Sequence, residues 1–312
     1  MGCLLPGLTL IRLPNLLIAM LTQAMVHQLL IRPALMEGNL VADLQPVDLL
    51  ALMLATVFVT AGGYVWNDIV DYPIDLVNKP GKVIIRKKIT LPMAYWLYAC
   101  CNLAGWVLAL YLAWTHNKSD WFLLYPISAG GLFWYSLRLK QRPFWGNLLI
   151  SLYCAGVPAL VWLAEQETLS QLKLIQPELY IQTANTVAAY ALFAFLTNLF
   201  REIVKDLQDM PGDYRYQLRT LPLVIGTQKA HTILLFIGGL LILSLVIWAK
   251  GLAPGLPAWL LLMGGIMTPL AFNLIQLFKA PSPLRYALIS RITKGIMLIG
   301  LLLLLLTHYY YV

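Results

Sequence analysis

Apolar residues occur along the chain in long runs separated by short polar segments. A helix needs about 20 consecutive apolar residues to cross a bilayer core that is about 30 Å thick. Runs of about this length predict transmembrane helices at 10–31, 47–66, 91–114, 119–137, 145–164, 180–200, 229–249, 254–278 and 291–311. We therefore expect an all-α membrane protein in which nine transmembrane helices form one bundle around a central cavity.

The composition supports this expectation and excludes several other classes of protein. Of the 312 residues, 60% are hydrophobic and only 12% are charged, and the mean hydropathy is +0.74. So few charges cannot coat a soluble globule, and the composition equally excludes disordered chains, fibres and disulfide scaffolds. Cys100, Cys101 and Cys154 lie inside apolar runs, where they are typical of small buried hydrophobes. We expect residues 1–312 to form a single polytopic domain.

The distribution of basic residues predicts the orientation of the chain. The net charge is +8, and an N-terminus in the cytoplasm leaves only four basic residues on the outer side: Arg32, Lys118, Lys173 and Lys250. Retention of Lys and Arg in cytoplasmic loops explains the basic excess, so no nucleic-acid partner is expected. We expect an integral, multi-pass protein of the cell (inner) membrane, with no obligate protein partner evident.

Acidic residues gather in two short segments at the expected cytoplasmic ends of the second and sixth helices. The segments are 67–75 and 202–213, and both contain the pattern D-x-x-D-x-P-x-D, which we interpret as an internal pseudo-repeat. Spacing of i, i+3 and i+7 places three carboxylates on one helical face. Pro73 and Pro211 disfavour regular helix at the residue before them, so the third aspartate of each motif could turn onto a loop.

Three carboxylates on one face repel one another unless they are solvated or neutralised by a cation. A solvated loop would explain either segment alone, but it does not explain the repeated spacing and the shared proline. Hard oxygen ligands without His or Cys favour Mg²⁺ or Mn²⁺. We therefore expect Mg²⁺ as cofactor, with these candidate metal ligands: Asp68, Asp71, Asp75, Asp206, Asp209 and Asp213.

The chemistry of such a site is narrow. Two acid clusters that face each other across a bundle would hold two ions with a diphosphate between them. Mg²⁺ and basic side chains stabilise the charge that develops on a departing diphosphate. If the leaving group sits on an allylic carbon, the product is a carbocation, and the rest of the substrate would be apolar.

These motifs resemble those of the UbiA superfamily of intramembrane prenyltransferases. The pattern N-D-x-x-D-x-x-x-D matches Asn67, Asp68, Asp71 and Asp75, and a second aspartate motif follows the sixth helix. The resemblance covers essentially the whole chain. It implies that the aspartates bind Mg²⁺ and a prenyl diphosphate, that Asn67 positions the diphosphate, and that Lys82 grips it, with Arg86 as a second candidate.

The resemblance extends to other basic residues, with one departure. Many members have Arg-Pro after the first motif, where this chain has Asn78-Lys79-Pro80-Gly81-Lys82, and lysine lacks the bidentate geometry of arginine. The resemblance also implies diphosphate contacts for Lys140, and similarity to the start of the family's first helix adds Arg12. Lys205 completes the diphosphate-binding set. The expected catalytic carboxylates are Asp71, Asp68 and Asp206, with Asp71 as the base that removes the acceptor proton.

Several neighbouring polar side chains have two interpretations. Tyr64 and Trp66 could shield a cation, but both residue types are common at any membrane interface, which we favour. Asn198 could line the cavity or bond a neighbouring helix. Glu202 could join the metal cluster, but pairing with Arg201 or Lys205 is favoured.

The function expected from the sequence is Mg²⁺-dependent transfer of a prenyl group from a prenyl diphosphate to an acceptor, with release of diphosphate on the cytoplasmic side. The Asn-Lys-Pro-Gly-Lys and Arg-Glu-Ile-Val-Lys-Asp segments most resemble geranylgeranylglycerol-phosphate geranylgeranyltransferases. Aromatic acceptors of quinone biosynthesis (4-hydroxybenzoate or dihydroxynaphthoate) remain open, as do haem and chlorophyllide. A cation-coupled transporter is the alternative from another class, although its acids should lie near mid-bilayer. A CDP-alcohol phosphotransferase would need a D-G-x-x-A-R signature, which the sequence lacks.

Overall fold

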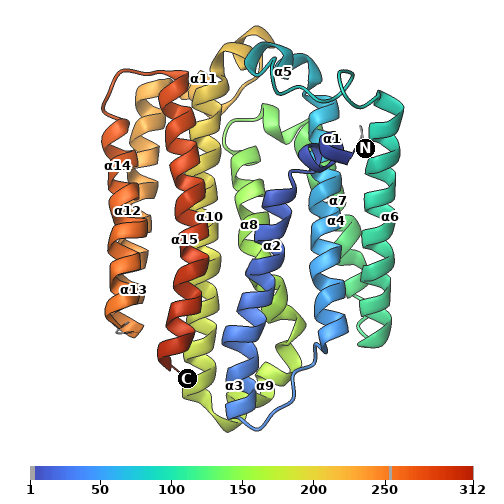
Figure 1. Cartoon of the computed structure of the whole chain (residues 1–312), viewed down its shortest axis with the longest axis vertical. Coiled ribbons are helices and arrows are strands. Elements are labelled where there is room, and N and C mark those ends of the chain that lie inside the picture. Colours follow the sequence, from blue (N-terminus) through green and yellow to red (C-terminus); the bar gives the residue numbers. More distant parts are fainter. Residues whose placement is uncertain (1–3, 253–254, 312) are drawn as a thin grey trace. The chain divides into compact units, whose positions relative to one another are not determined.

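The computed structural model describes residues 4–252 and 255–311, which are almost entirely helical (Figure 1). The chain divides into two compact units. The first contains Met1–Ala24, Leu44–Arg142 and Pro211–Gln217, and the second contains Met25–Asp43, Pro143–Met210 and Leu218–Val312. The all-helical prediction is confirmed for the described residues.

The first unit is built on three long helices that pack side by side, α4, α6 and α7 (Figure 1). Its elements are α1 (Leu4–Leu10), most of α2 (Leu13–Val26), α4 (Pro46–Val70), α5 (Tyr72–Asn78), α6 (Leu91–Thr115), α7 (Trp121–Leu137) and the 3₁₀ turn η2 (Leu139–Gln141). Small residues bring these helices together, because a Cβ atom at Gly105 of α6 would lie 2.2 Å from the Tyr125 hydroxyl of α7. Such close approach is how helices associate where burial from water provides no driving force.

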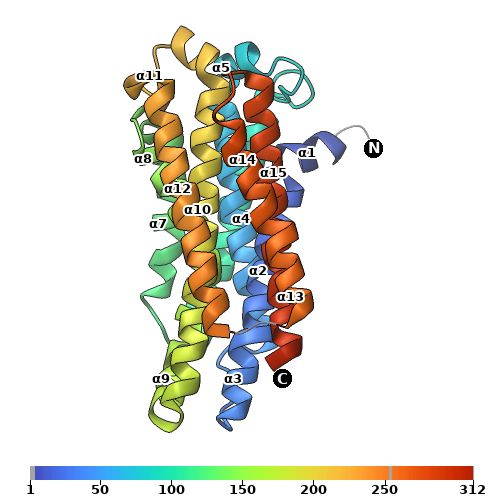
Figure 2. The same ribbon diagram turned by 90° about the vertical axis from the view of Figure 1, so that its left-hand side faces the viewer.

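The second unit packs the remaining helices around a continuous apolar core that includes Phe200, Ile203, Leu234 and Ile289. Figure 2 shows α13, η3 and α14 following one another along a single path beside α15. The elements are η1 (His27–Ile31), α3 (Arg32–Glu37), α8 (Trp145–Ala164), α9 (Gln166–Ile175), α10 (Pro177–Arg215), α11 (Leu221–Ile225), α12 (Thr227–Leu252), α13 (Leu256–Leu260), η3 (Leu261–Met267), α14 (Thr268–Gln276) and α15 (Pro283–Tyr311).

Eight helical stretches within the described ranges are long and apolar enough to cross a membrane. The ninth expected span, 119–137, forms the helix Trp121–Leu137, which has 17 residues and rises only about 25 Å. The count of nine transmembrane helices and the cytoplasmic N-terminus therefore stay predictions.

The predicted boundaries of the first span, 10–31, are wrong. α1 ends at Leu10, Arg12 has a left-handed backbone (φ 54°), and a new helix begins at Leu13. Pro14 explains the break, because proline fits the first turn of a helix but crowds the preceding turn in a helix interior. The helix that follows continues through η1 and α3 to Glu37.

The prolines of the two aspartate motifs act differently. At Pro73 the helix is interrupted as expected, since α4 ends at Val70 and α5 begins at Tyr72 with the proline in its first turn, but Asp75 lies within α5 and not on a loop. At Pro211 both parts of the expectation are wrong, because α10 runs for 39 residues through the proline to Arg215. The amide of Gly212 donates to Asn78 Oδ1 at 2.8 Å, so the backbone next to this proline keeps a partner from outside the helix.

The close contact of α6 with α7 generates a stability prediction. Gly105→Ala should lower the thermal unfolding midpoint in detergent, because the added methyl group forces the Tyr125 ring to move, and overpacking of this kind costs about 1–3 kcal/mol. Gly130→Ala in α7 is the matched control, because its Cβ has nothing within 4 Å. Equal midpoints for the two variants would contradict this account of the packing.

Candidate active site

The first aspartate motif lies where α4 ends and α5 begins. Asn67 and Asp68 are in the last turn of α4, Asp71 follows the helix end, and Asp75 is in the first turn of α5. The side chain of Asp71 is buried, with the residue only 3% exposed. The sequence folds this way because Pro73 starts a new helix, which places the motif on two short stretches that meet at Asp71.

Two cations and one amide form hydrogen bonds with this motif within the first unit. Arg12 Nη2 donates to Asp68 Oδ1 at 2.7 Å. The ammonium of Lys140, from η2, contacts Asp71 Oδ2, and Asn67 Nδ2 donates to the same oxygen at 2.7 Å. The structure thus brings three of the predicted diphosphate-binding residues, Arg12, Asn67 and Lys140, to the first motif.

Lys140 interacts electrostatically with all three carboxylates of the motif. Burial alone would lower the pKa of the Lys140 ammonium, but the adjacent Asp71 carboxylate, with contributions from Tyr135 and Asp75, raises it above its ordinary value. Burial raises the pKa of the Asp75 carboxyl, and the negative charge of Asp71 raises it further. With Lys79 acting on Asp75 as well, the three carboxylates face three cations, Arg12, Lys140 and Lys79.

The second motif lies along α10. Because α10 continues through Pro211, Asp206, Asp209 and Asp213 keep the i, i+3 and i+7 spacing of one helical face. Asn147 of α8 donates through Nδ2 to Asp206 Oδ2 at 2.8 Å, and this contact lies within the second unit. Asp213 is buried, and it belongs to the first unit, together with the first motif.

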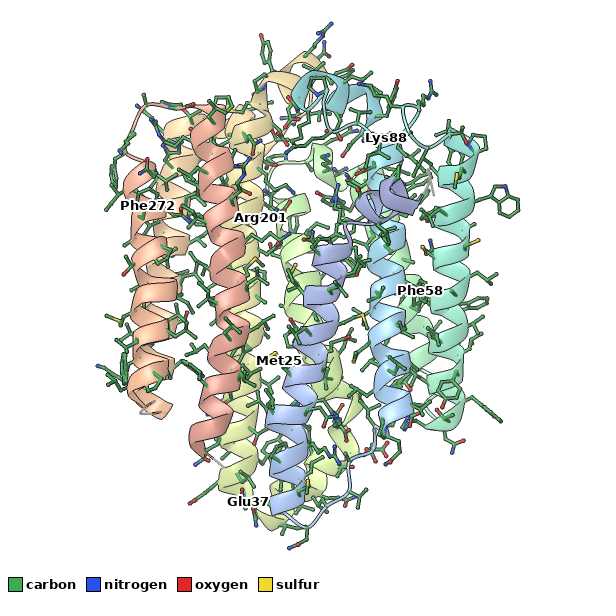
Figure 3. The ribbon with its side chains drawn as sticks, viewed as in Figure 1. Met25, Glu37, Phe58, Lys88, Arg201 and Phe272 are labelled. Atoms are coloured by element: carbon green, nitrogen blue, oxygen red, sulfur yellow. The ribbon has the colours of Figure 1, made fainter. Side chains whose placement is uncertain are left out.

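Two predicted diphosphate ligands are placed differently from the others. Lys205 donates to both carboxylate oxygens of Glu202 at 2.9 Å, and Arg201 lies 3.3 Å from that carboxylate, which confirms the ion-pair interpretation of Glu202. Lys82 is exposed, and its side chain makes no ion pair with any described residue. It lies in the loop after α5 that also carries Lys88, labelled in Figure 3.

Sequence reasoning missed two polar residues that hold the motifs in place. Asn147 orients Asp206, and Asn78 accepts the Gly212 amide hydrogen within the first unit. At Gly212 a Cβ atom would lie only 2.4 Å from Asn78 Oδ1, so the two segments approach without space for a side chain. An amide at the start of an apolar run was the signal for Asn147, whereas the contact of Asn78 depends on tertiary folding.

Trp66, Asn198 and Tyr64, for which the sequence allowed two interpretations, each contact another side chain of the protein. Trp66 stacks on Phe133 with ring centroids 4.7 Å apart, and Asn198 Nδ2 lies 3.4 Å from Ser151 Oγ on α8. Asn198 therefore bonds a neighbouring helix. The Tyr64 ring lies 4.4 Å beneath the Arg12 guanidinium, which supports the arginine that binds Asp68.

The donor chemistry fits Mg²⁺ if substrate completes the coordination. Across residues 4–252 and 255–311, no three Asp, Glu, His or Cys side chains are close enough together to hold an ion by themselves. Mg²⁺ in enzymes is commonly bound by one or two carboxylates together with substrate phosphates and water. Asp68, Asp71 and Asp75 supply suitable oxygens, with Lys140 beside them for a phosphate.

Comparison with known proteins identifies the family. The model of the UbiA prenyltransferase family matches residues 34–310. A digeranylgeranylglyceryl phosphate synthase from Pyrococcus horikoshii is 32% identical over 211 residues, which cover 66% of this chain and 68% of that protein. Several other proteins of that name match over 54% to 78% of their length.

Solved structures show the same fold. One from a study of digeranylgeranylglyceryl phosphate synthase in membranes has a TM-score of 0.65 at 24% identity, with 99% of this chain and 100% of that chain covered. A UbiA homologue from Archaeoglobus fulgidus, solved with GPP and Mg²⁺, has a TM-score of 0.52 at 14% identity, with 96% and 99% covered. With aspartate motifs at helix ends, eight candidate spans and a family match over most of its length, this chain belongs to the UbiA prenyltransferase family of membrane enzymes.

Proposed function

We propose that this prenyltransferase uses Mg²⁺ to transfer a geranylgeranyl group from geranylgeranyl diphosphate to geranylgeranylglyceryl phosphate, with release of diphosphate at the cytoplasmic face. The family match supports prenyl transfer, and the digeranylgeranylglyceryl phosphate synthases among its relatives support this donor and acceptor. The observation that carries the proposal is the buried Asp71 carboxylate in contact with Lys140, beside Asp68 and Asp75.

The proposed binding step exchanges partners at the first motif. In the structure the Asp71 carboxylate holds Lys140 and Asn67, and Asp68 holds Arg12. The aspartates would hold Mg²⁺, which supplies stabilisation of the negative charge that develops on the diphosphate. Lys140 and Arg12 would then donate to diphosphate oxygens, and Asn67 would keep Asp71 oriented.

The chemical step is dissociative in this proposal. The bond between the allylic carbon and its oxygen breaks, the diphosphate takes the electron pair, and the acceptor hydroxyl oxygen attacks the cation. A carboxylate of the motifs, which we assign to Asp71, takes the hydroxyl proton. Asp68 and Asp206 are the other proposed catalytic carboxylates, and Asn147 donates to Asp206. Asp209 and Asp213 are the other proposed metal ligands, whereas Lys82 and Lys205 are proposed contacts for the diphosphate.

The contacts of the motifs disfavour a cation-coupled transporter. Asp68 and Asp71 lie at the end of a candidate span and are already paired with Arg12 and Lys140, whereas coupling sites are expected near the bilayer midplane. Aromatic acceptors remain to be compared with glyceryl phosphates in the same assay.

Asp71→Asn should reduce diphosphate release from geranylgeranyl diphosphate by about 100-fold or more, because it removes one negative charge from the cluster and the proton acceptor. The measurement is the initial rate of diphosphate release by purified enzyme in detergent with Mg²⁺ and acceptor. Asp120→Asn, an exposed carboxylate at the start of α7, is the matched control and should retain full activity. Unchanged release by Asp71→Asn would remove Asp71 from the mechanism.

Removal of divalent ions should abolish the reaction. Treatment with EDTA is expected to stop diphosphate release, and addition of Mg²⁺ or Mn²⁺ should restore it, because oxygen-only ligands suit these hard ions. Restoration by Zn²⁺ alone, or full activity in EDTA, would contradict the assigned cofactor.

The contact between Gly212 and Asn78 generates a double-mutant prediction. Gly212→Ala should lower activity because its methyl group would overlap Asn78 Oδ1, and Asn78→Ala should lower it because the Gly212 amide loses its acceptor. In the double variant the methyl group has room, so the combined loss should be smaller than the sum of the two single losses. Strict additivity of the free energies of activation would show that the two residues act independently.

A further inference from the structure

A second group of charges lies on the second unit, nearer the middle of the helices than the second aspartate motif. Arg201 of α10, labelled in Figure 3, lies 3.3 Å from Glu202. Lys205 contacts the same carboxylate at 2.9 Å, and Lys294 of α15 is within electrostatic range of Arg201. The group therefore combines three cations from two helices with the carboxylate of Glu202.

These cations lie well inside their helices. Arg201 is 14 residues before the end of α10, a rise of about 21 Å, and Lys294 is 11 residues after the start of α15, a rise of about 16 Å. The neighbouring core residues Phe200, Ile203 and Ile296 are almost completely buried. Because α10 is longer than a bilayer crossing needs, Arg201 lies at the end of the expected span 180–200, where a partly buried cation beside an apolar core needs an anionic partner.

The donors of this group suit an anion with several oxygens. Arg201 Nε is buried and has no hydrogen-bond partner among the described residues, although its Nη1 reaches Glu202. A guanidinium has five donors in a planar fork that matches a phosphate, so one carboxylate leaves part of the fork available. Arg201 therefore has a donor, Nε, that could form a hydrogen bond with such an anion.

The group is offset from the second aspartate motif along α10. Arg201 precedes Asp206 by five residues on α10, which corresponds to a rise of about 7.5 Å. Asp206 itself accepts from Asn147, and Cys154 of α8 is within electrostatic range of Glu202, Arg201 and Lys205. A ligand held by Arg201 would thus lie beside α8. It would be about one and a half turns closer to the N-terminus of α10 than the carboxylate of Asp206.

We infer that Arg201, with Lys294, binds the phosphate monoester of the prenyl acceptor and selects anionic over neutral acceptors. The inference rests on the proposed function, because it assigns the acceptor's headgroup to residues of this chain. In a glyceryl phosphate the free hydroxyl is only a few bonds from the phosphate. Anchoring of the phosphate at Arg201 therefore holds the acceptor hydroxyl near this end of α10, where Asp206, a proposed catalytic carboxylate, is five residues away along the helix.

The test compares two acceptors in the full-length enzyme: geranylgeranylglyceryl phosphate and the same molecule without its phosphate. The unaltered enzyme should transfer to the phosphate form with much higher kcat/KM. Arg201→Gln should raise the KM for the phosphate acceptor by about 10- to 100-fold, the range expected for loss of a charge-assisted hydrogen bond, and should leave the KM for geranylgeranyl diphosphate unchanged. Lys294→Gln should act in the same direction, and Arg201→Lys should have a smaller effect.

Arg291→Gln is the matched control, because Arg291 is exposed on the same helix as Lys294. Equal efficiency of the unaltered enzyme with both acceptors would overturn the inference, and this measurement does not depend on whether any variant folds. A rise in the KM for geranylgeranyl diphosphate in Arg201→Gln, in place of the acceptor effect, would overturn it by assigning the group to the diphosphate. If neither acceptor gives diphosphate release, the proposed function itself fails, and this inference fails with it.

Discussion

The contact between the Lys140 ammonium and the Asp71 carboxylate organises the polar end of the first unit. A carboxylate that is 3% exposed needs a cation or several hydrogen bonds, and Lys140 and Asn67 provide both. The same lysine acts on Asp68 and Asp75, so the charges of the motif are balanced by a residue more than 60 positions away in the sequence. Arg12 completes the balance at Asp68.

This arrangement explains why cations and carboxylates are concentrated in the same loops. A site that binds a diphosphate through Mg²⁺ has to be neutralised when substrate is absent, and ion pairs that can be exchanged meet that need. Lysine and arginine that neutralise the aspartates would become ligands of the diphosphate when the metal arrives.

Much of the fold could be predicted because a bilayer imposes one length and one polarity on each crossing helix. The helical class followed from the apolar runs, and the candidate site was proposed from the repeated aspartate spacing. The breaks were less predictable: Pro14 and Pro73 each lie in the first turn of a new helix, but Pro211 lies inside one. The difference depends on the contact of Gly212 with Asn78, which joins positions 134 residues apart and leaves no local signal. The proximity of Lys294 to Arg201 could not be predicted from the sequence, because it depends on the packing of α15 against α10.

The central claim is that the aspartates bind divalent ions beneath a prenyl diphosphate. The most direct test is anomalous X-ray scattering from crystals grown with Mn²⁺ and an unreactive thio analogue of geranylgeranyl diphosphate. The account predicts manganese peaks bonded both to motif carboxylates, Asp68 or Asp71 among them, and to phosphate oxygens of the analogue. A bound analogue whose diphosphate contacts only basic side chains, with no manganese at the aspartates, would contradict it.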